Sequence, residues 1–246
     1  MQCALCHKDS KLCLSHIFPE HLYKESLYDE NHKFHRVSDE DDKNRPRAFQ
    51  KGLREHLLCV KCEQQLSVYE TYAAEILFGG PELLFEKFGE YLTLSNLDYP
   101  KLKLYQLSLI WRASVSRNPD FHAVNLGKHG EIIRQMILQS NPGSSDLYGS
   151  LMFVVKDGDD LASGFFLPPV ATRLDGHIAY WYVIGGVAFV HVVTSSPIRR
   201  VISDFFAQSE GTAIVKVQQL AEIGVLRRRI AKFNEEGRFD TLFKDK

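Results

Sequence analysis

The stretch that decides the fold is Cys3-Ala4-Leu5-Cys6, followed by Ser15-His16-Ile17-Phe18-Pro19 and then by Leu57-Leu58-Cys59-Val60-Lys61-Cys62-Glu63. Two Cys-x-x-Cys pairs can place four thiolates at the corners of a tetrahedron, which is the geometry of a closed, structural zinc site. Such a site would close a loop of roughly fifty residues, whose ends chain entropy would otherwise keep apart. The spacing therefore predicts one structural Zn²⁺ held by Cys3, Cys6, Cys59 and Cys62.

The composition is that of an ordinary globular protein with balanced charge. The 246 residues include 30 Lys and Arg against 31 Asp and Glu, a formal net charge of −1. The net charge is therefore too small to attract the chain to nucleic acid or to a membrane surface. Any polyanion would have to bind a local patch of basic residues. The sequence contains neither a membrane-spanning apolar run nor a signal-peptide pattern at Met1-Gln2-Cys3. We expect a cytoplasmic protein, in which paired cysteines bind metal more often than they form disulfides.

Two units are expected, 1–95 and 96–246, with the second beginning near Asp98-Tyr99-Pro100. In the first, the polar stretch from Lys24 to Gly52 predicts a long surface loop, since it has few aliphatic residues. Three- and four-residue apolar steps after Glu63 predict a helix that Gly79-Gly80-Pro81 ends. A second, short amphipathic helix is expected from Glu82 to Tyr91.

The sequence of the second unit predicts a domain of helices and antiparallel strands. Arg112 lies within a mostly apolar helix, and a buried arginine needs carboxylate or carbonyl partners. The pair Gly185-Gly186 accepts the positive φ angles of a two-residue turn and so predicts a hairpin. The expected helices are Lys103–Ser116, Glu131–Gln139, Pro197–Ala207 and Val215–Asn234, and the expected strands are 151–155, 164–167, 180–184 and 187–193. The predicted fold class is α+β, a four-cysteine zinc finger followed by this domain.

The cysteine pairs, the Ser15-His16-Ile17-x-Pro19 element and Leu57-Leu58-Cys59-x-x-Cys62-Glu63 resemble the zinc-bearing branch of the HNH (ββα-metal) endonucleases. The resemblance covers about a third of the chain. It implies a ββα finger in which His16 is the general base that activates water against a phosphodiester, as a neutral imidazole can do. It also implies a second divalent ion, Mg²⁺ or Mn²⁺, that stabilises the pentacovalent phosphate.

This chain departs from the family pattern at the positions that hold the second ion. Ser15 stands where the family has Asp, Arg54 aligns near the family's Asn, and Glu63 stands where the helix carries His. A carboxylate is a good ligand for a hard cation, so Glu63 preserves one possible contact, with Glu70 or an acidic loop residue as a further candidate. A carboxylate in the first turn of a helix is equally explained by the helix dipole.

Two functions follow from the resemblance. The first is a DNA-directed, metal-dependent endonuclease with His16 and Glu63 as catalytic residues. The second is a catalytically inactive zinc-finger module that binds DNA or a protein partner. The motifs Ser15 to Tyr23, Leu57 to Glu70 and Leu107 to Ser116 are also similar to a group of bacterial proteins that look like components of anti-phage or mobile-element cassettes. That likeness implies a role in antiviral defence.

Overall fold

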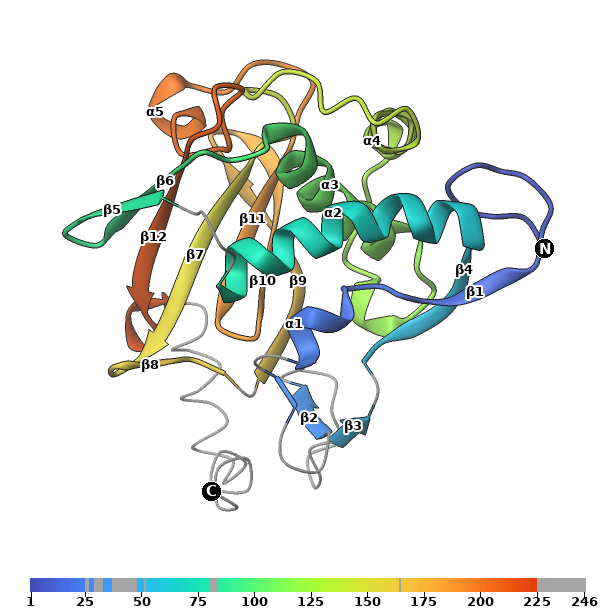
Figure 1. Ribbon diagram of the computed structural model, residues 1–246, viewed down its shortest axis with the longest axis horizontal. Coiled ribbons are helices and arrows are strands. Elements are labelled where there is room, and N and C mark those ends of the chain that lie inside the picture. The colour runs from blue at the N-terminus through green and yellow to red at the C-terminus, as the bar shows by residue number, and fades with distance from the viewer. Residues whose placement is uncertain are drawn as a thin grey trace.

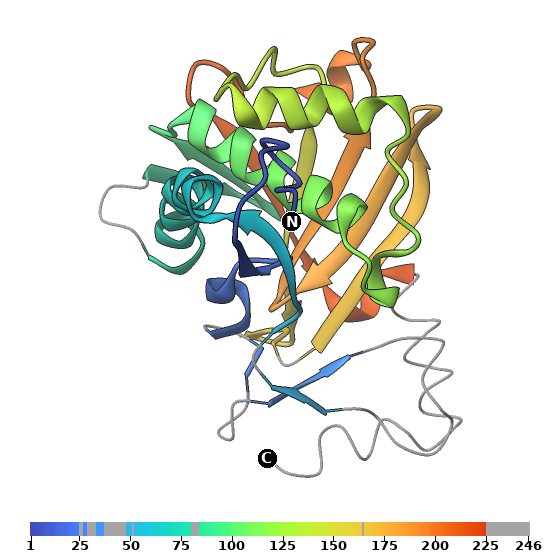
Figure 2. The ribbon, with the colours of Figure 1, turned by 90° about the vertical axis from the view of Figure 1, so that its right-hand side faces the viewer.

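The computed structural model describes residues 1–24, 27–28, 33–36, 48–50, 52–79, 84–163 and 165–224. A large mixed sheet forms the centre of the molecule, and helices α2, α3 and α4 lie on one side of it (Figures 1 and 2). A separate two-stranded sheet, β1 with β4, leads into α2. The predicted α+β class is confirmed, and the four-cysteine cluster lies near the N-terminus. None of the helices in these ranges is long and apolar enough to cross a lipid bilayer.

The N-terminal part wraps a short antiparallel pair of strands against the start of a long helix. Its elements are β1 (Leu12–His16), α1 (Glu20–Lys24), β2 (Lys33–Arg36), β3 (Ala48–Gln50), β4 (Arg54–Cys59) and α2 (Val60–Phe78). Strand β1 pairs with β4 so that His16 lies opposite Arg54 and Leu12 lies opposite Cys59. The predicted end of α2 is confirmed, because Gly79 adopts a left-handed φ of 103° and its N–H bonds the Glu75 carbonyl.

The large sheet has the strand order β3-β2-β9-β10-β11-β7-β12-β6-β5, and β8 pairs with β7. The pairs β2–β9 and β7–β12 are parallel, and the others are antiparallel. The predicted hairpin is confirmed, since Gly185 and Gly186 connect β10 to β11 with φ values of 57° and 73°. The remaining strands of the sheet are β5 (Leu84–Phe88), β6 (Tyr91–Ser95), β7 (Ser150–Asp157), β8 (Asp160–Leu161), β9 (Phe165–Leu174), β10 (His177–Ile184), β11 (Val187–Val193) and β12 (Ala213–Gln219).

Helix α3 (Tyr99–Val115) is the centre of the core. It is buried almost along its whole length, begins at the cap residue Asp98, and packs against both α2 and α4 (Lys128–Leu138). Residues Pro119–Phe121 and Leu220–Glu222 form short 3₁₀ helices. One continuous apolar core runs from Cys3 and Leu5 through α2 and α3 to the sheet. The boundary at residue 95 stays a prediction, although strands from both sides of it join one sheet.

Two expectations for the first unit are wrong. The sequence predicts a helix over residues 82–91, but β5 and β6 form a hairpin that turns at Gly89, with φ of 58°, and Glu90. Pairing of β5 with β6, and of β6 with the distant β12, decides the structure of this segment. The expected loop from Lys24 to Gly52 contains β2 and β3, because β2 finds a partner in β9. The rest of that stretch, 25–26, 29–32, 37–47 and 51, lies outside the described residues.

Two expected C-terminal helices are also wrong. Only α5 (Arg200–Ser203) forms between residues 197 and 207. The helix expected from Val215 is instead strand β12, in which Val215 lies opposite Met152 and Val217 lies opposite Val154. The β-branched residues at alternate positions favour a strand once β7 is available as a parallel partner. Residues 225–234 of that expected helix lie outside the described part of the chain.

Candidate metal centre and its arginine-bound neighbour

The four predicted ligands are brought together. The sulfur atoms of Cys3, Cys6, Cys59 and Cys62 all lie within 4.8 Å of one another. The Cys6 and Cys59 sulfurs are 3.9 Å apart. Zn–S bonds of about 2.3 Å in a tetrahedron give S–S edges of about 3.8 Å. The Cys6–Cys59 separation matches that edge, and the 4.8 Å limit on the other pairs places all four sulfurs close enough to share one Zn²⁺ ion. Four protein sulfurs would fill every position of a tetrahedral ion, as they do in zinc sites that are structural.

Local backbone geometry explains why the thiols converge. Cys59 is the last residue of β4 and Cys62 lies in the first turn of α2, so one strand-to-helix junction supplies two ligands. The first pair is held to that junction by Ala4, whose N–H donates to the Leu57 carbonyl at 3.1 Å. The Cys59 N–H donates to the Cys3 sulfur at 3.3 Å, a contact that suits a thiolate. Burial raises the pKa values of the Cys3 and Cys62 thiols, so a bound cation is what would keep them ionised.

The imidazole of His16 is engaged by an arginine. Arg54 faces His16 across the β1–β4 pair, and its Nε donates to His16 Nε2 at 2.8 Å. Burial and, secondly, the charge of Arg54 lower the pKa of His16 to about 4. The ring is therefore neutral near pH 7, with its unprotonated nitrogen already accepting a hydrogen bond. A Cβ added to Gly52 would lie 3.1 Å from His16 Cδ2, so Gly52 leaves room for this ring.

Glu63 lies in the first turn of α2, near Ser15, which precedes His16 on β1 and so faces the opposite side of that strand. The pKa of Glu63 is raised by burial, while the nearby Ser15 hydroxyl and the charge of Arg112 oppose the rise. One carboxylate oxygen, Oε1, is buried without a hydrogen-bond partner among the described residues. Ser15 and Glu63, the two positions that the resemblance assigns to a second ion, are therefore neighbours.

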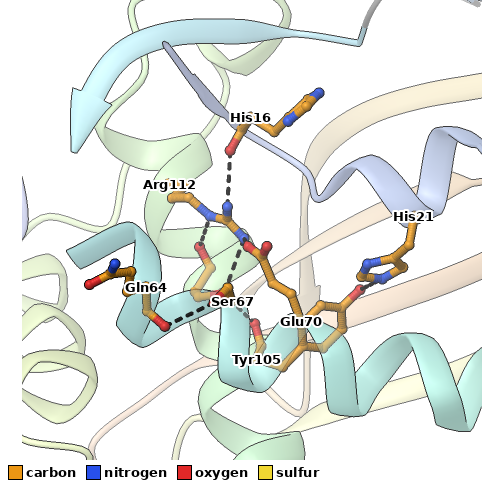
Figure 3. A network of polar contacts seen from close by, with 8 residues as sticks. His16, His21, Gln64, Ser67, Glu70, Tyr105 and Arg112 are labelled. Carbon is orange, nitrogen blue, oxygen red and sulfur yellow. Dashed lines mark hydrogen bonds and ion pairs between the residues drawn. The ribbon is translucent and has the colours of Figure 1, made fainter. Parts of the chain in front are cut away.

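Arg112 supplies a fixed positive charge beside these groups. Its side chain is 1% exposed, and its Nη2 lies 2.7 Å from Glu70 Oε1. Nη1 donates to the His16 carbonyl at 2.9 Å, and Nε donates to the Ser108 carbonyl at 3.3 Å. Figure 3 shows the His16 carbonyl directed at the guanidinium and the imidazole directed away from it. The expected carboxylate and carbonyl partners of Arg112 are confirmed, and Glu70 is an ion-pair partner rather than a free surface acid.

In the described ranges, the cysteine tetrad is the only group of three or more Cys, His, Asp or Glu side chains placed to hold a metal ion. His16 and Glu63 do not form such a group with a third residue there. The acidic loop residues Asp39-Glu40-Asp41-Asp42 lie outside the described part. The contact that sequence reasoning missed is Arg54 with His16, which depends on the register of β1 against β4.

The Arg54–His16 contact can be tested by an NMR titration of the His16 ring. In the Arg54→Ala variant we expect the pKa of His16 to rise from about 4 toward its ordinary value, because a neighbouring cation no longer opposes protonation. Since the native pKa lies below the unfolded value of about 6.5, neutral His16 stabilises the fold above that pH and loses this effect as pH falls toward 4. Ring ¹H–¹⁵N shifts followed from pH 8 to pH 3 would measure the change.

His21 is the control in the same spectrum. Its pKa is also lowered to about 4, by burial and then by Arg112, while its ring contacts Tyr105 rather than Arg54. His21 should therefore titrate unchanged in the Arg54→Ala variant. Equal shifts at both histidines would indicate a general loosening of the fold, and no shift at His16 would contradict the contact.

Comparisons of this chain with known protein families, with curated proteins and with solved structures found no match.

Proposed function

We propose that this protein is a zinc-centred module that binds nucleic acid and does not cut it. The observation that carries the proposal is the 2.8 Å hydrogen bond from Arg54 to His16 Nε2, which occupies the nitrogen that a general base would use. A base must have a free lone pair within reach of the water it activates. Here that lone pair accepts from a permanent cation.

The charge beside Glu63 supports the same conclusion. Arg112 is buried next to Glu63 and Glu70, so the acidic pair already has a counter-charge. A divalent ion placed at Glu63 would lie close to a guanidinium in a region of low dielectric, where like charges repel strongly. A catalytic site of the family type needs that ion to stabilise the developing phosphate charge. Arg112 is too deeply buried to perform this role by touching a substrate itself.

Nucleic acid is the proposed ligand because of the resemblance and because of the cations near the finger. Lys8, Lys11 and Lys61 are exposed near the two cysteine pairs, where they are available to phosphates. Phosphate contacts by lysine and arginine give binding that weakens steeply with salt. The zinc ion would act by holding this surface together, not by contacting the ligand.

The experiment combines binding and cleavage on the zinc-loaded full chain. Labelled single- and double-stranded DNA and RNA would be titrated at several salt concentrations and then incubated with Mg²⁺ or Mn²⁺. We expect salt-dependent binding, no cleavage, and loss of binding in Cys59→Ser. Cleavage by the unmodified protein that His16→Ala abolishes would contradict the proposal. Absence of binding to every nucleic acid would instead favour a protein partner.

A metal-dependent endonuclease is the second candidate function. The arrangement that favours it is the antiparallel pair β1–β4 followed directly by α2, which puts His16 at a strand end and Glu63 in the first helical turn. In this case Arg54 would have to leave His16 when a substrate phosphate attracts its guanidinium. Cleavage that appears in Arg54→Ala and disappears in the Arg54→Ala/His16→Ala double variant would support this candidate.

The similarity to bacterial cassette proteins supports a role for either function in defence against phage. Phage plating on cells that carry the intact system, or the same system with Cys59→Ser, would test that role. A difference in plating that depends on Cys59 would support it, and equal plating would contradict it.

A further inference from the structure

A cavity distant from the cysteine cluster has no place in the function proposed so far. It has a volume of about 700 Å³ and lies between the start of α4 and strands β9 and β10. The volume is in the size range of small-molecule sites, and the cavity is wide open to solvent, so a ligand in it would stay partly exposed. Its lining includes the cations Lys128 and Arg173, the apolar side chain of Ile178, and Tyr180. None of the described residues that line it carries a carboxylate.

The two cations are free to meet an anion. Among the described residues, neither Lys128 nor Arg173 forms an ion pair, whereas Arg199 pairs with Asp175 and Arg200 pairs with Asp204. Arg173 Nη1 donates to the Gly176 carbonyl at 2.9 Å, and its other N–H groups have no acceptor in the part of the chain that the structure describes. A cavity that contains unpaired cations and no acid favours a negatively charged ligand.

The walls of the cavity are held in place by hydrogen bonds. The Tyr180 hydroxyl donates to the Asn125 carbonyl at 2.7 Å and accepts from the Asn125 N–H at 3.0 Å, which joins the segment before α4 to β10. His129 Nδ1 lies 2.9 Å from the Tyr148 hydroxyl. Burial lowers the pKa of His129, and Lys128 adds to this effect. These bonds fix the wall of the cavity that Asn125 and Tyr180 form, while Lys128 and Arg173 lie exposed at its surface.

The cations of the cavity favour an anionic group on the ligand, and the apolar surface beside them favours an apolar group on the same ligand. Ile178 is 45% exposed, which is unusual for an isoleucine on a strand at the centre of a sheet. A nucleotide has both parts in one molecule, a phosphate and a flat base with apolar faces. We propose that this cavity binds a nucleoside phosphate unit, with the phosphate at Lys128 and Arg173 and the base against Ile178.

Helix α4 connects this cavity to the zinc finger. Arg134 in the same helix donates through Nη1 to the Leu5 carbonyl, between the first two cysteine ligands. Arg134 lies six positions after Lys128, which is about 9 Å along the helix axis. One strand of nucleic acid could therefore reach both places. This inference deepens the proposed function and rests on it for the choice of a nucleotide among anions.

The test uses the zinc-loaded full chain with four probes: adenosine 5′-monophosphate, adenosine, inorganic phosphate and a labelled oligodeoxyadenylate. Variants Arg173→Gln and Lys128→Gln each remove one cation of the cavity. We expect each to weaken binding of the oligonucleotide by about tenfold, since charge-assisted hydrogen bonds are strong. Each should also make the salt slope shallower by about 0.7. Adenosine 5′-monophosphate should compete with the oligonucleotide, and adenosine should not.

Arg200→Gln is the matched control, because Arg200 is 91% exposed and lies outside the cavity. Equal effects of Arg200→Gln and Arg173→Gln would overturn the proposal, as would failure of every probe to bind. Oligonucleotide binding that needs zinc but ignores both cavity variants would keep the proposed function and remove the cavity from it. Cavity-dependent binding of the mononucleotide alone would identify a free nucleotide as the ligand, and would remove nucleic-acid binding as the function.

Discussion

Replacing Cys62 by serine is expected to abolish zinc binding and to lower the free energy of unfolding of the whole chain. Cys62 is buried, and its sulfur is one of four that lie within 4.8 Å of one another. Zinc binding of this kind supplies about 10–16 kcal/mol of apparent free energy in small zinc domains, and this counts as folding free energy. Whole proteins are stable by only about 5–15 kcal/mol, so even part of that loss is decisive. Zinc content per chain and urea unfolding would measure both effects.

Cys13→Ser is the matched control for this variant. Cys13 is on β1, close in sequence to the first pair, but it is outside the tetrad. The Cys13→Ser protein should retain one zinc ion per chain, and its urea midpoint should be near that of the unmodified protein. A folded Cys62→Ser protein with its full zinc content would contradict the assignment of the metal centre.

The effect should extend beyond the finger. Cys3, Cys62 and Leu66 belong to the same apolar core as Leu104 and Tyr182, so no layer of solvent separates the metal centre from the sheet. Loss of zinc frees the first cysteine pair, whose Leu5 carbonyl accepts from Arg134 in α4. We therefore expect a lower midpoint for the single transition of the whole chain, not an independent early transition of a small domain.

The metal centre was predictable because its information is local. Each Cys-x-x-Cys pair fixes two ligands within one turn, and only two such pairs exist among the five cysteines. Helices α2 and α3 were predictable for a similar reason, since their apolar spacing and the stop at Gly79 are properties of one segment. The hairpin at Gly185-Gly186 needed only a turn whose φ angles favour glycine.

The errors concern segments whose structure depends on a distant partner. Residues 84–95 become strands because β6 pairs with β12, and residues 213–219 become a strand because β7 accepts them in parallel. Neither partner is adjacent in sequence, so local periodicity predicted a helix in both segments and was wrong. The candidate site has the same difficulty. His16 was recognised from its motif, but its contact with Arg54 follows from strand register across 38 residues of chain.

Replacing Arg112 by methionine is expected to destabilise the protein by about 3–5 kcal/mol, the usual cost of removing one partner of a buried ion pair. Glu70 would lose the guanidinium that lies 2.7 Å away, and Glu63 would lose a nearby positive charge. The His16 and Ser108 carbonyls would also lose their donors. Urea unfolding at neutral pH would give the free energy of unfolding, compared with Arg200→Met, an exposed arginine expected to change it by less than about 0.5 kcal/mol.

The double variant Arg112→Met/Glu70→Gln separates charge from packing. If the loss of stability comes mainly from carboxylates left without a counter-charge, neutralising Glu70 should recover part of the stability. The coupling free energy should then be about 0.5–3 kcal/mol. The recovery of stability should be incomplete, because no other group replaces the guanidinium beside Glu63 and the His16 carbonyl. Additive effects of the two changes would contradict the ion pair. A single variant as stable as the unmodified protein would also remove Arg112 as the charge that stands beside Glu63, and with it one of the two arguments for a finger that binds without cutting.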